Sequence, residues 1–158
     1  MARIRDGRLF RRILHPSDFS AASRPAFRHA LELAKASGAH LLVAHVLPVV
    51  PLVPDAYVVA TTYDALQRAQ RASGQKQLGR LVRTATAAGV RASGVLLDVG
   101  GPAERLTQLA KSSRADVIVM GTHGRTGLQH MLLGSVAETV VRLAPCPVLT
   151  VKPQGVAM

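Results

Sequence analysis

Short apolar runs alternate along this chain with longer stretches in which apolar residues recur every three or four positions. The runs are typical of strands buried in a parallel sheet, and the recurrence is typical of helices that bury one face. The strands are expected at 11–15, 40–47, 90–99, 117–120 and 148–151. The helices are expected at about 20–37 and 63–88, and from residues 102 and 135 onward.

Strands that alternate with helices predict an α/β fold, a parallel sheet with helices on both faces. Such sheets bind ligands beyond the carboxyl ends of their strands, where the strand order reverses. If the first and fourth strands are neighbours, Asp18 lies across a crevice from Gly121 and Gly124. We expect one domain over residues 11–153, preceded by a basic extension at 1–10 and followed by a short tail at 154–158.

Glycines are concentrated after the fourth expected strand, before Ser135 opens a helix with one apolar face. Glycine lets the backbone approach a ligand closely, and a helix N-terminus offers unpaired N–H groups and the positive end of the helix dipole. Together these features suit a phosphate group. An alternative needs no ligand: Ser135 and Glu138 form an S-x-x-E capping box, and the glycines only turn the chain.

The charge of the chain favours anionic partners without naming one. Its formal net charge is +11, and no acidic residue occurs between Asp64 and Asp98, a stretch that holds several arginines. Such a surface attracts anions, including nucleic acid. Because no motif interleaves basic and aromatic residues for base stacking, specific nucleic-acid binding is not expected, and a solvated basic face is favoured.

Other classes of protein are disfavoured by composition. The single cysteine, Cys146, cannot form an internal disulfide, which fits a reducing cytoplasm. The most apolar window, 41–60, contains His45, Asp55 and three prolines, so a membrane helix is not expected. The histidines lack metal-ligand spacing, so a metal site built by the protein is not expected either. The proline-containing stretch 48–62 predicts a loop over the ligand side or a partner contact.

Three places in the sequence resemble the universal stress protein family. Residues 13–20 read I-L-H-P-S-D-F-S, residues 44–46 read A-H-V, and Gly121, Gly124 and Gly134-Ser135 have the spacing G-x2-G-x9-G-S. The resemblance covers about residues 11–152. It implies a three-layer, doubly wound, five-stranded parallel sheet of strand order 3-2-1-4-5 and a ligand of the ATP type. Mg²⁺ would then arrive on the phosphates and keep most of its waters.

The resemblance also implies roles for individual residues. Pro16 and Asp18 would line the adenine and ribose end, Val46 would contact adenine through its backbone, and Met120 would pack nearby. The ribose and phosphates would be surrounded by Gly121, His123, Gly124, Gly134, Ser135 and Val136. Arg125 stands where a P-loop keeps its lysine and can steer phosphate. Two alternatives remain: Asp18 as the N-cap of the first helix, and His123 as an exposed loop residue.

These features predict an ATP-binding module that acts in stress response or regulation. No general base is recognisable, so hydrolysis is expected to be slow or absent. One alternative is a slow nucleotide hydrolase that uses the same crevice. Another is a dimeric interaction module whose pocket is vestigial. The last strand is expected at a sheet edge, and the resemblance implies a homodimer joined through Pro147–Lys152.

Overall fold

Five parallel strands form one sheet in the computed structural model, which describes residues 9–50, 60–122 and 133–153. The strands are β1 (Arg12–Pro16), β2 (His40–Val46), β3 (Ala92–Leu97), β4 (Val117–Gly121) and β5 (Val148–Val151). Their order is β3-β2-β1-β4-β5, with every neighbouring pair parallel. The predicted strand order 3-2-1-4-5 is therefore confirmed. Strand order reverses at β1, because the chain leaves β1 for β2 on one side and later returns with β4 on the other.

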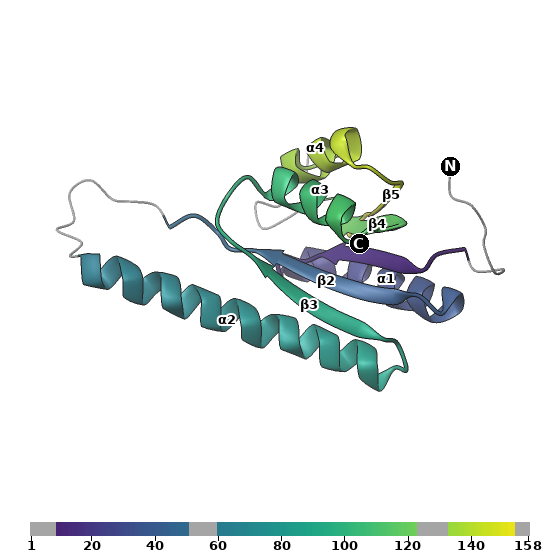
Figure 1. Ribbon diagram of the computed structural model, residues 1–158, viewed down its shortest axis with the longest axis horizontal. Coiled ribbons are helices and arrows are strands. Elements are labelled where there is room, and N and C mark those ends of the chain that lie inside the picture. Colours follow the sequence, from purple (N-terminus) through teal and green to yellow (C-terminus); the bar gives the residue numbers. More distant parts are fainter. Residues whose placement is uncertain (1–8, 51–59, 123–132, 154–158) are drawn as a thin grey trace, which may run out of the picture.

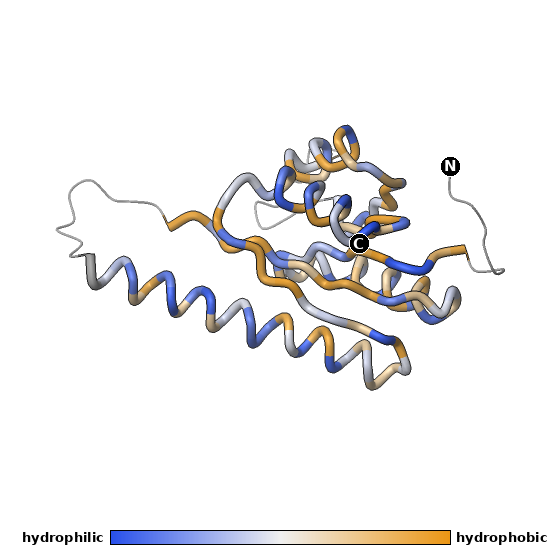
Figure 2. The backbone as a smooth tube through the Cα atoms, in the orientation of Figure 1, coloured by the Kyte–Doolittle hydropathy of each residue, from blue (hydrophilic) through white to orange (hydrophobic). Residues whose placement is uncertain are grey.

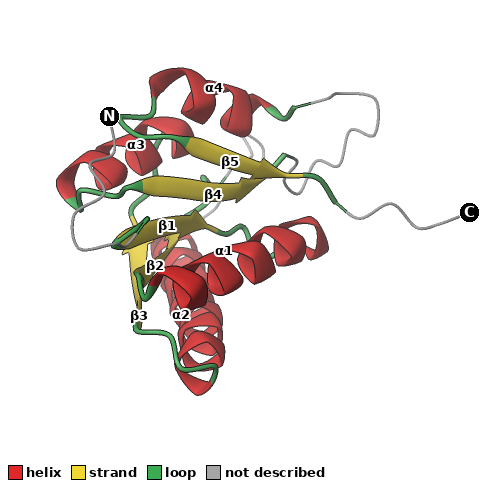
Figure 3. Cartoon of the chain, turned by 90° about the vertical axis from the view of Figure 1, so that its right-hand side faces the viewer, coloured by secondary structure: helices red, strands yellow, loops and turns green. Residues whose placement is uncertain are grey.

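Helices cover both faces of the sheet (Figures 1 and 3). One face carries α1 (Arg24–Ser37), which follows the short 3-10 helix η1 (Ala21–Ser23), and α2 (Ala60–Ala87). The other face carries α3 (Pro102–Ser112) and α4 (Ser135–Leu143). The doubly wound α/β architecture is thus as predicted. Among the described residues, no helix has both the length and the apolar character that a membrane span requires.

Alternate residues of the central strands pack into two separate hydrophobic cores, one on each face of the sheet. Ile13 of β1 points into the core beneath α1 and α2, whereas its neighbour Leu14 points into the core beneath α3 and α4. Both side chains are fully buried. Figure 2 shows the resulting apolar strands at the centre of the molecule. A strand buried on both faces has a continuous apolar run, which is why the pattern located these strands from the sequence.

Two glycines show where local sequence rules hold and where they fail. Gly38 ends α1 as expected, in the left-handed conformation at φ 61°. A glycine inside a helix costs about 1 kcal/mol relative to alanine, yet α2 continues through Gly74. A Cβ atom at Gly74 would lie 3.0 Å from Leu96 Cδ1 and 3.4 Å from His45 Cδ2. The missing side chain therefore lets α2 lie close to β2 and β3.

Candidate functional site

A cavity of about 320 Å³ opens at the carboxyl ends of the central strands, at the point where strand order reverses. Its walls come from the turn after β1, the end of β2, the first turns of α3 and α4, and the end of β4. Ligands of doubly wound sheets bind in this position because loops from both sides of the reversal diverge there. The geometry therefore makes this cavity the candidate site.

Eight of the eleven site residues expected from the sequence line this one cavity: Pro16, Asp18, Val46, Met120, Gly121, Gly134, Ser135 and Val136. They come from four segments that are far apart in the sequence. The other three, His123, Gly124 and Arg125, lie outside the residues that the structure describes. Whether the eight contact a ligand stays a prediction, but they are neighbours in space.

Asp18 is held in the turn between β1 and η1. Its Oδ1 accepts hydrogen bonds from the backbone N–H of Ser20, at 3.0 Å, and from the Ser20 hydroxyl, at 2.6 Å. The alternative that Asp18 is the N-cap of the first helix is wrong, because Ser20 precedes η1 and Ser23 precedes α1. These bonds fix the orientation of a carboxylate that lines the cavity.

Phe19 gives the same turn an unusual backbone. Its φ is 63°, a conformation that bulky side chains rarely adopt. The Phe19 N–H donates to Ser17 Oγ at 3.1 Å, and the phenyl ring lies 4.2 Å from the ring of His45, centre to centre. His45 Nδ1 in turn donates to the Ser17 carbonyl at 2.8 Å. The turn that carries Asp18 is therefore tied to β2.

The first turn of α4 presents its backbone to the cavity. Gly134 is the N-cap, in an extended conformation, and no side chain caps the helix within the described residues. The capping box of Ser135 and Glu138 is therefore wrong: Ser135 already belongs to the helix, and the Glu138 N–H donates to the Gly134 carbonyl at 2.9 Å. The first N–H groups of a helix have no partner inside it. Ser135, Val136 and Ala137, the first three residues of α4, carry such groups and line the cavity.

Several lining residues were not expected from the sequence: Ser17, Ser23, Ala44, His45, Pro102, Leu106, Thr122 and Ala137. Leu106 lies on the buried face of α3, so its position in the pattern indicates core rather than site. Leu106, Val46, Met120 and Val136 make the walls largely apolar. The cavity thus combines apolar walls, one fixed carboxylate and a helix N-terminus, a set able to hold a flat apolar ring and an attached anion.

Comparisons with known proteins agree with this architecture. The model of the universal stress protein family matches residues 9–152. Universal stress protein MJ0531 of Methanocaldococcus jannaschii is 37% identical over 150 residues, which cover 94% of this chain and 86% of that protein. The structure of MJ0577 from the same organism matches with a TM-score of 0.79 at 25% identity, over 92% of this chain and 97% of that one. A universal stress protein in complex with cAMP matches with a TM-score of 0.63 at 26% identity, over 92% and 98%. The chain belongs to the universal stress protein family.

Proposed function

We propose that this chain binds ATP in the cavity at the carboxyl edge of the sheet and acts as a cytoplasmic regulator in stress response. The observation that carries the proposal is the arrangement of that cavity: apolar walls, the carboxylate of Asp18 and the first turn of α4 line one space. A relative of the same fold is described in complex with cAMP, which supports an adenine nucleotide as the class of ligand.

Each part of ATP has a complementary part of the cavity. The adenine ring would lie between the apolar side chains of Val46, Met120 and Leu106, and Asp18 would accept hydrogen bonds from the ribose hydroxyls. The phosphates would lie against the N–H groups at Ser135 and Val136, where the helix dipole favours negative charge. About 320 Å³ is at the small end of ligand pockets, so the outer phosphates would extend beyond it.

We propose, from the family resemblance, that His123, Gly124 and Arg125 complete the phosphate site. Mg²⁺ would arrive on the phosphates with most of its waters, as it does in many nucleotide sites. His45, the lining histidine, has its Nδ1 committed to the Ser17 carbonyl. Because the sequence shows no recognisable general base, hydrolysis is expected to be slow, and the proposed role is binding rather than turnover.

Calorimetry with ATP and Mg²⁺ tests the site through Gly134→Val. Gly134 has a φ of −72°, which valine adopts without strain, so the added side chain would fill space in the cavity. We expect micromolar affinity for the wild type and a loss of at least a hundredfold in the variant, about 2.7 kcal/mol of binding free energy. Adding Gly124→Val should abolish the remaining binding.

The matched control is Gly79→Val on α2, where an added Cβ would meet only the flexible side chain of Arg83. It should bind ATP as the wild type does. Undiminished binding by Gly134→Val would reject this site. A wild type that binds no adenine nucleotide would favour the interaction module with a vestigial pocket. Steady turnover of about 1 per second or more would favour the hydrolase.

We also propose a homodimer joined through Pro147–Lys152. The strand β5 is at one edge of the sheet, and Leu149 on it is 45% exposed. The Ile118 N–H donates to the Pro147 carbonyl and the Thr122 N–H to the Val151 carbonyl. Because backbone groups alternate in direction along a strand, those of Val148 and Thr150 face the open edge. An antiparallel copy of β5 would pair with them.

Thr150→Pro tests this pairing, because it removes an N–H that faces outward and leaves the bonds to β4 in place. Light scattering should find a dimeric wild type and a largely monomeric variant at the same concentration. Two leucines that are equally exposed, Leu149 on β5 and Leu66 on α2 at 45% each, test the hydrophobic contact. Leu149→Arg should weaken the dimer, and Leu66→Arg on α2 should not. A monomeric wild type, or a variant that stays dimeric, would reject this interface.

A further inference from the structure

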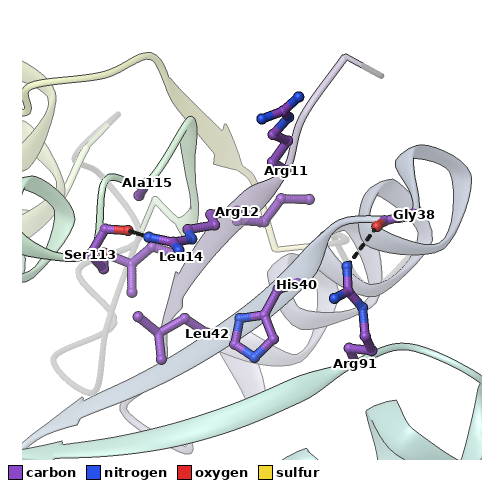
Figure 4. Close-up of a pocket in the computed structure, with 10 residues that line it drawn as sticks. Arg11, Arg12, Leu14, Gly38, His40, Leu42, Arg91, Ser113 and Ala115 are labelled. Carbon is purple, nitrogen blue, oxygen red and sulfur yellow. Dashed lines mark hydrogen bonds between the residues drawn. The ribbon is translucent and has the colours of Figure 1, made fainter. Parts of the chain in front are cut away.

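A second cavity, of about 810 Å³, lies at the opposite, amino-terminal edge of the sheet (Figure 4). Three of its basic lining residues lie at strand starts: Arg12 at the start of β1, His40 at the start of β2 and Arg91 before β3. Arg11 and the backbone at the C-terminal ends of α1 and α3 also line it. None of its lining residues belongs to the candidate nucleotide site. The proposed function therefore leaves this cavity unexplained.

The strand register brings the three basic side chains together. Arg12 pairs with His40 across β1 and β2, and the Leu41 N–H donates to the Arg91 carbonyl across the next pair. Leu14 and Leu42, two residues further along β1 and β2, pack in the core beneath α3 and α4. Side chains two residues apart share a face of a strand, so Arg12 and His40 point to the α3 face of the sheet.

Arg91 lies at the same edge of the sheet; its side chain starts on the α3 face and its guanidinium reaches the end of α1. Its neighbour Ala92 packs in the opposite core, and the hydroxyl of Ser93, two residues further along, lies 3.2 Å from His40 Nε2. Neighbouring strands are about 4.8 Å apart, so the backbones at Arg12 and Arg91 are separated by about 10 Å, with His40 between them. Figure 4 shows the imidazole between the two arginine side chains, whereas Arg11 points away from them.

Each of the two arginines donates one side-chain N–H group to a backbone carbonyl at the end of a helix. Arg12 Nη1 donates to the Ser113 carbonyl after α3 at 2.6 Å, and Arg91 Nη2 donates to the Gly38 carbonyl after α1 at 3.3 Å. These bonds hold the guanidinium groups in place. A guanidinium has five N–H donors, and within the described residues the structure shows no further hydrogen bond or ion pair of these two side chains.

The nearby carboxylate does not neutralise the cluster through an ion pair. Asp116 Oδ2 accepts the backbone N–H groups of Arg11 and Arg12, at 2.7 and 2.8 Å. The effect on His40 reports the local field: its pKa is lowered, first by burial and then by the positive charges of Arg91 and Arg12. Both guanidinium groups therefore make the electrostatic potential around the His40 ring more positive.

We propose that this cavity is a second ligand site, which binds a small anion with two or more negative charges on phosphate groups through Arg12 and Arg91. Guanidinium groups bind phosphate oxygens through pairs of parallel N–H bonds. The existing bonds to the helix ends would reduce the ordering needed on binding. The hollow has the volume of a small-molecule pocket rather than the extent of a nucleic-acid groove.

The test is a titration of the ¹⁵N-labelled full chain with inorganic pyrophosphate, followed through backbone amide signals. Binding at the proposed site should shift the signals of His40, Ser113 and Ala115. Binding at the nucleotide cavity would instead shift those of Ser135 and Val136. Shifts confined to that second set, or none at 10-fold excess over about 1 mM protein, would overturn this inference, and the proposed ATP site would be unaffected.

Two charge-matched double variants decide whether the site is specific. Arg12→Gln with Arg91→Gln should lower the affinity for pyrophosphate at least tenfold. Arg80→Gln with Arg83→Gln removes the same charge from the exposed surface of α2 and should change it less than twofold. An equal loss in both pairs would show a diffuse electrostatic effect and overturn the proposal. The proposal would also be overturned if a 12-nucleotide single strand bound more tightly than pyrophosphate and both double variants weakened that binding equally.

The two arginines also cap helix ends, so a third variant guards against misfolding. Arg12→Lys with Arg91→Lys keeps both charges but cannot form paired N–H bonds to one phosphate. Thermal unfolding shows whether each variant is folded. In folded Lys variants the affinity should fall at least threefold, and an unchanged affinity would overturn the role of the guanidinium forks.

Discussion

The two edges of the sheet attract anions by different means. At the carboxyl edge, α4 begins at Gly134 and Ser135, so backbone N–H groups and the positive end of the helix dipole face the cavity. At the amino edge, α1 and α3 end, and their carbonyls bring partial negative charge. There Arg12 and Arg91 bond to those carbonyls and supply the positive charge themselves.

This difference follows from the fold. In a sheet of parallel strands joined by helices, helices begin near the carboxyl edge and end near the amino edge. The backbone alone favours an anion at the first edge, whereas the second needs basic side chains to reverse its polarity. A site built from backbone should therefore be sensitive to added bulk, and a site built from side chains should be sensitive to lost charge.

The largest predicted effect concerns β1 and β4, the adjacent strands that run between the two edges. His15 of β1 is fully buried, and its Nδ1 donates to the Val119 carbonyl of β4 at 2.8 Å. Within the described part of the chain, its Nε2 has no hydrogen-bond partner. Burial lowers the pKa of His15 to about 4, against smaller upward effects of the Val119 bond and the charge of Asp18. The folded protein therefore holds this histidine neutral.

A histidine whose pKa is lower in the folded state stabilises the fold fully above its unfolded pKa of 6.5, and this contribution disappears as the pH falls through 4. The total is about 3 kcal/mol, of which about 2 kcal/mol should be lost between pH 7 and pH 5. Urea unfolding at both pH values should show this loss in the wild type and not in His15→Leu.

The control for His15→Leu is His29→Gln, which removes an exposed histidine from α1. It should keep the pH dependence of the wild type. If His15→Leu loses as much stability as the wild type between pH 7 and pH 5, protonation of His15 is not the cause of the loss, and this interpretation is wrong.

Much of this fold could be predicted from the sequence because local pattern and tertiary packing agree. The apolar runs at Ile13 and Val117 mark strands buried on both faces, and Gly38 marks a helix end. The strand order came from the family resemblance rather than from the pattern. At Gly74 local preference opposed tertiary packing, and the closeness of Leu96 and His45 explains why the helix continues.

The candidate site was predictable only in part. The glycine spacing pointed to Gly134 and Ser135, but the capping box was wrong because the helix begins one residue earlier than that motif requires. The cluster at the amino edge was visible only as scattered charge. Arg12 and Arg91 are far apart in the sequence, and only the register of β1, β2 and β3 brings them to one face.

A substitution at the start of α4 should separate capping from phosphate binding. Ser135→Asp adds negative charge at the positive end of the helix dipole, so it should stabilise the protein by about 0.5 kcal/mol. The same charge should repel a nucleotide and lower ATP affinity about tenfold, or 1.4 kcal/mol. Calorimetry and urea unfolding would measure the two opposite changes.

Ser135→Asn is the matched control, because it has a similar shape and no charge. It should bind ATP within threefold of the wild type. If Ser135→Asp binds ATP as well as Ser135→Asn does, no phosphate lies at the first turn of α4, and the backbone interpretation of the carboxyl edge fails.

The last prediction concerns salt. At the amino edge, pyrophosphate would bind through exposed guanidinium groups, so raising NaCl from about 50 to 300 mM should lower its affinity about tenfold. At the carboxyl edge, adenine burial between Val46 and Met120 adds a contribution that salt does not screen, so ATP affinity should fall no more than about threefold. Amide signals of Ser113 and Ser135 would follow the two sites separately.

Uncharged adenosine is the control for the carboxyl edge and should bind equally at both salt concentrations. Equal salt dependence of pyrophosphate and ATP would mean that both edges attract anions in the same way.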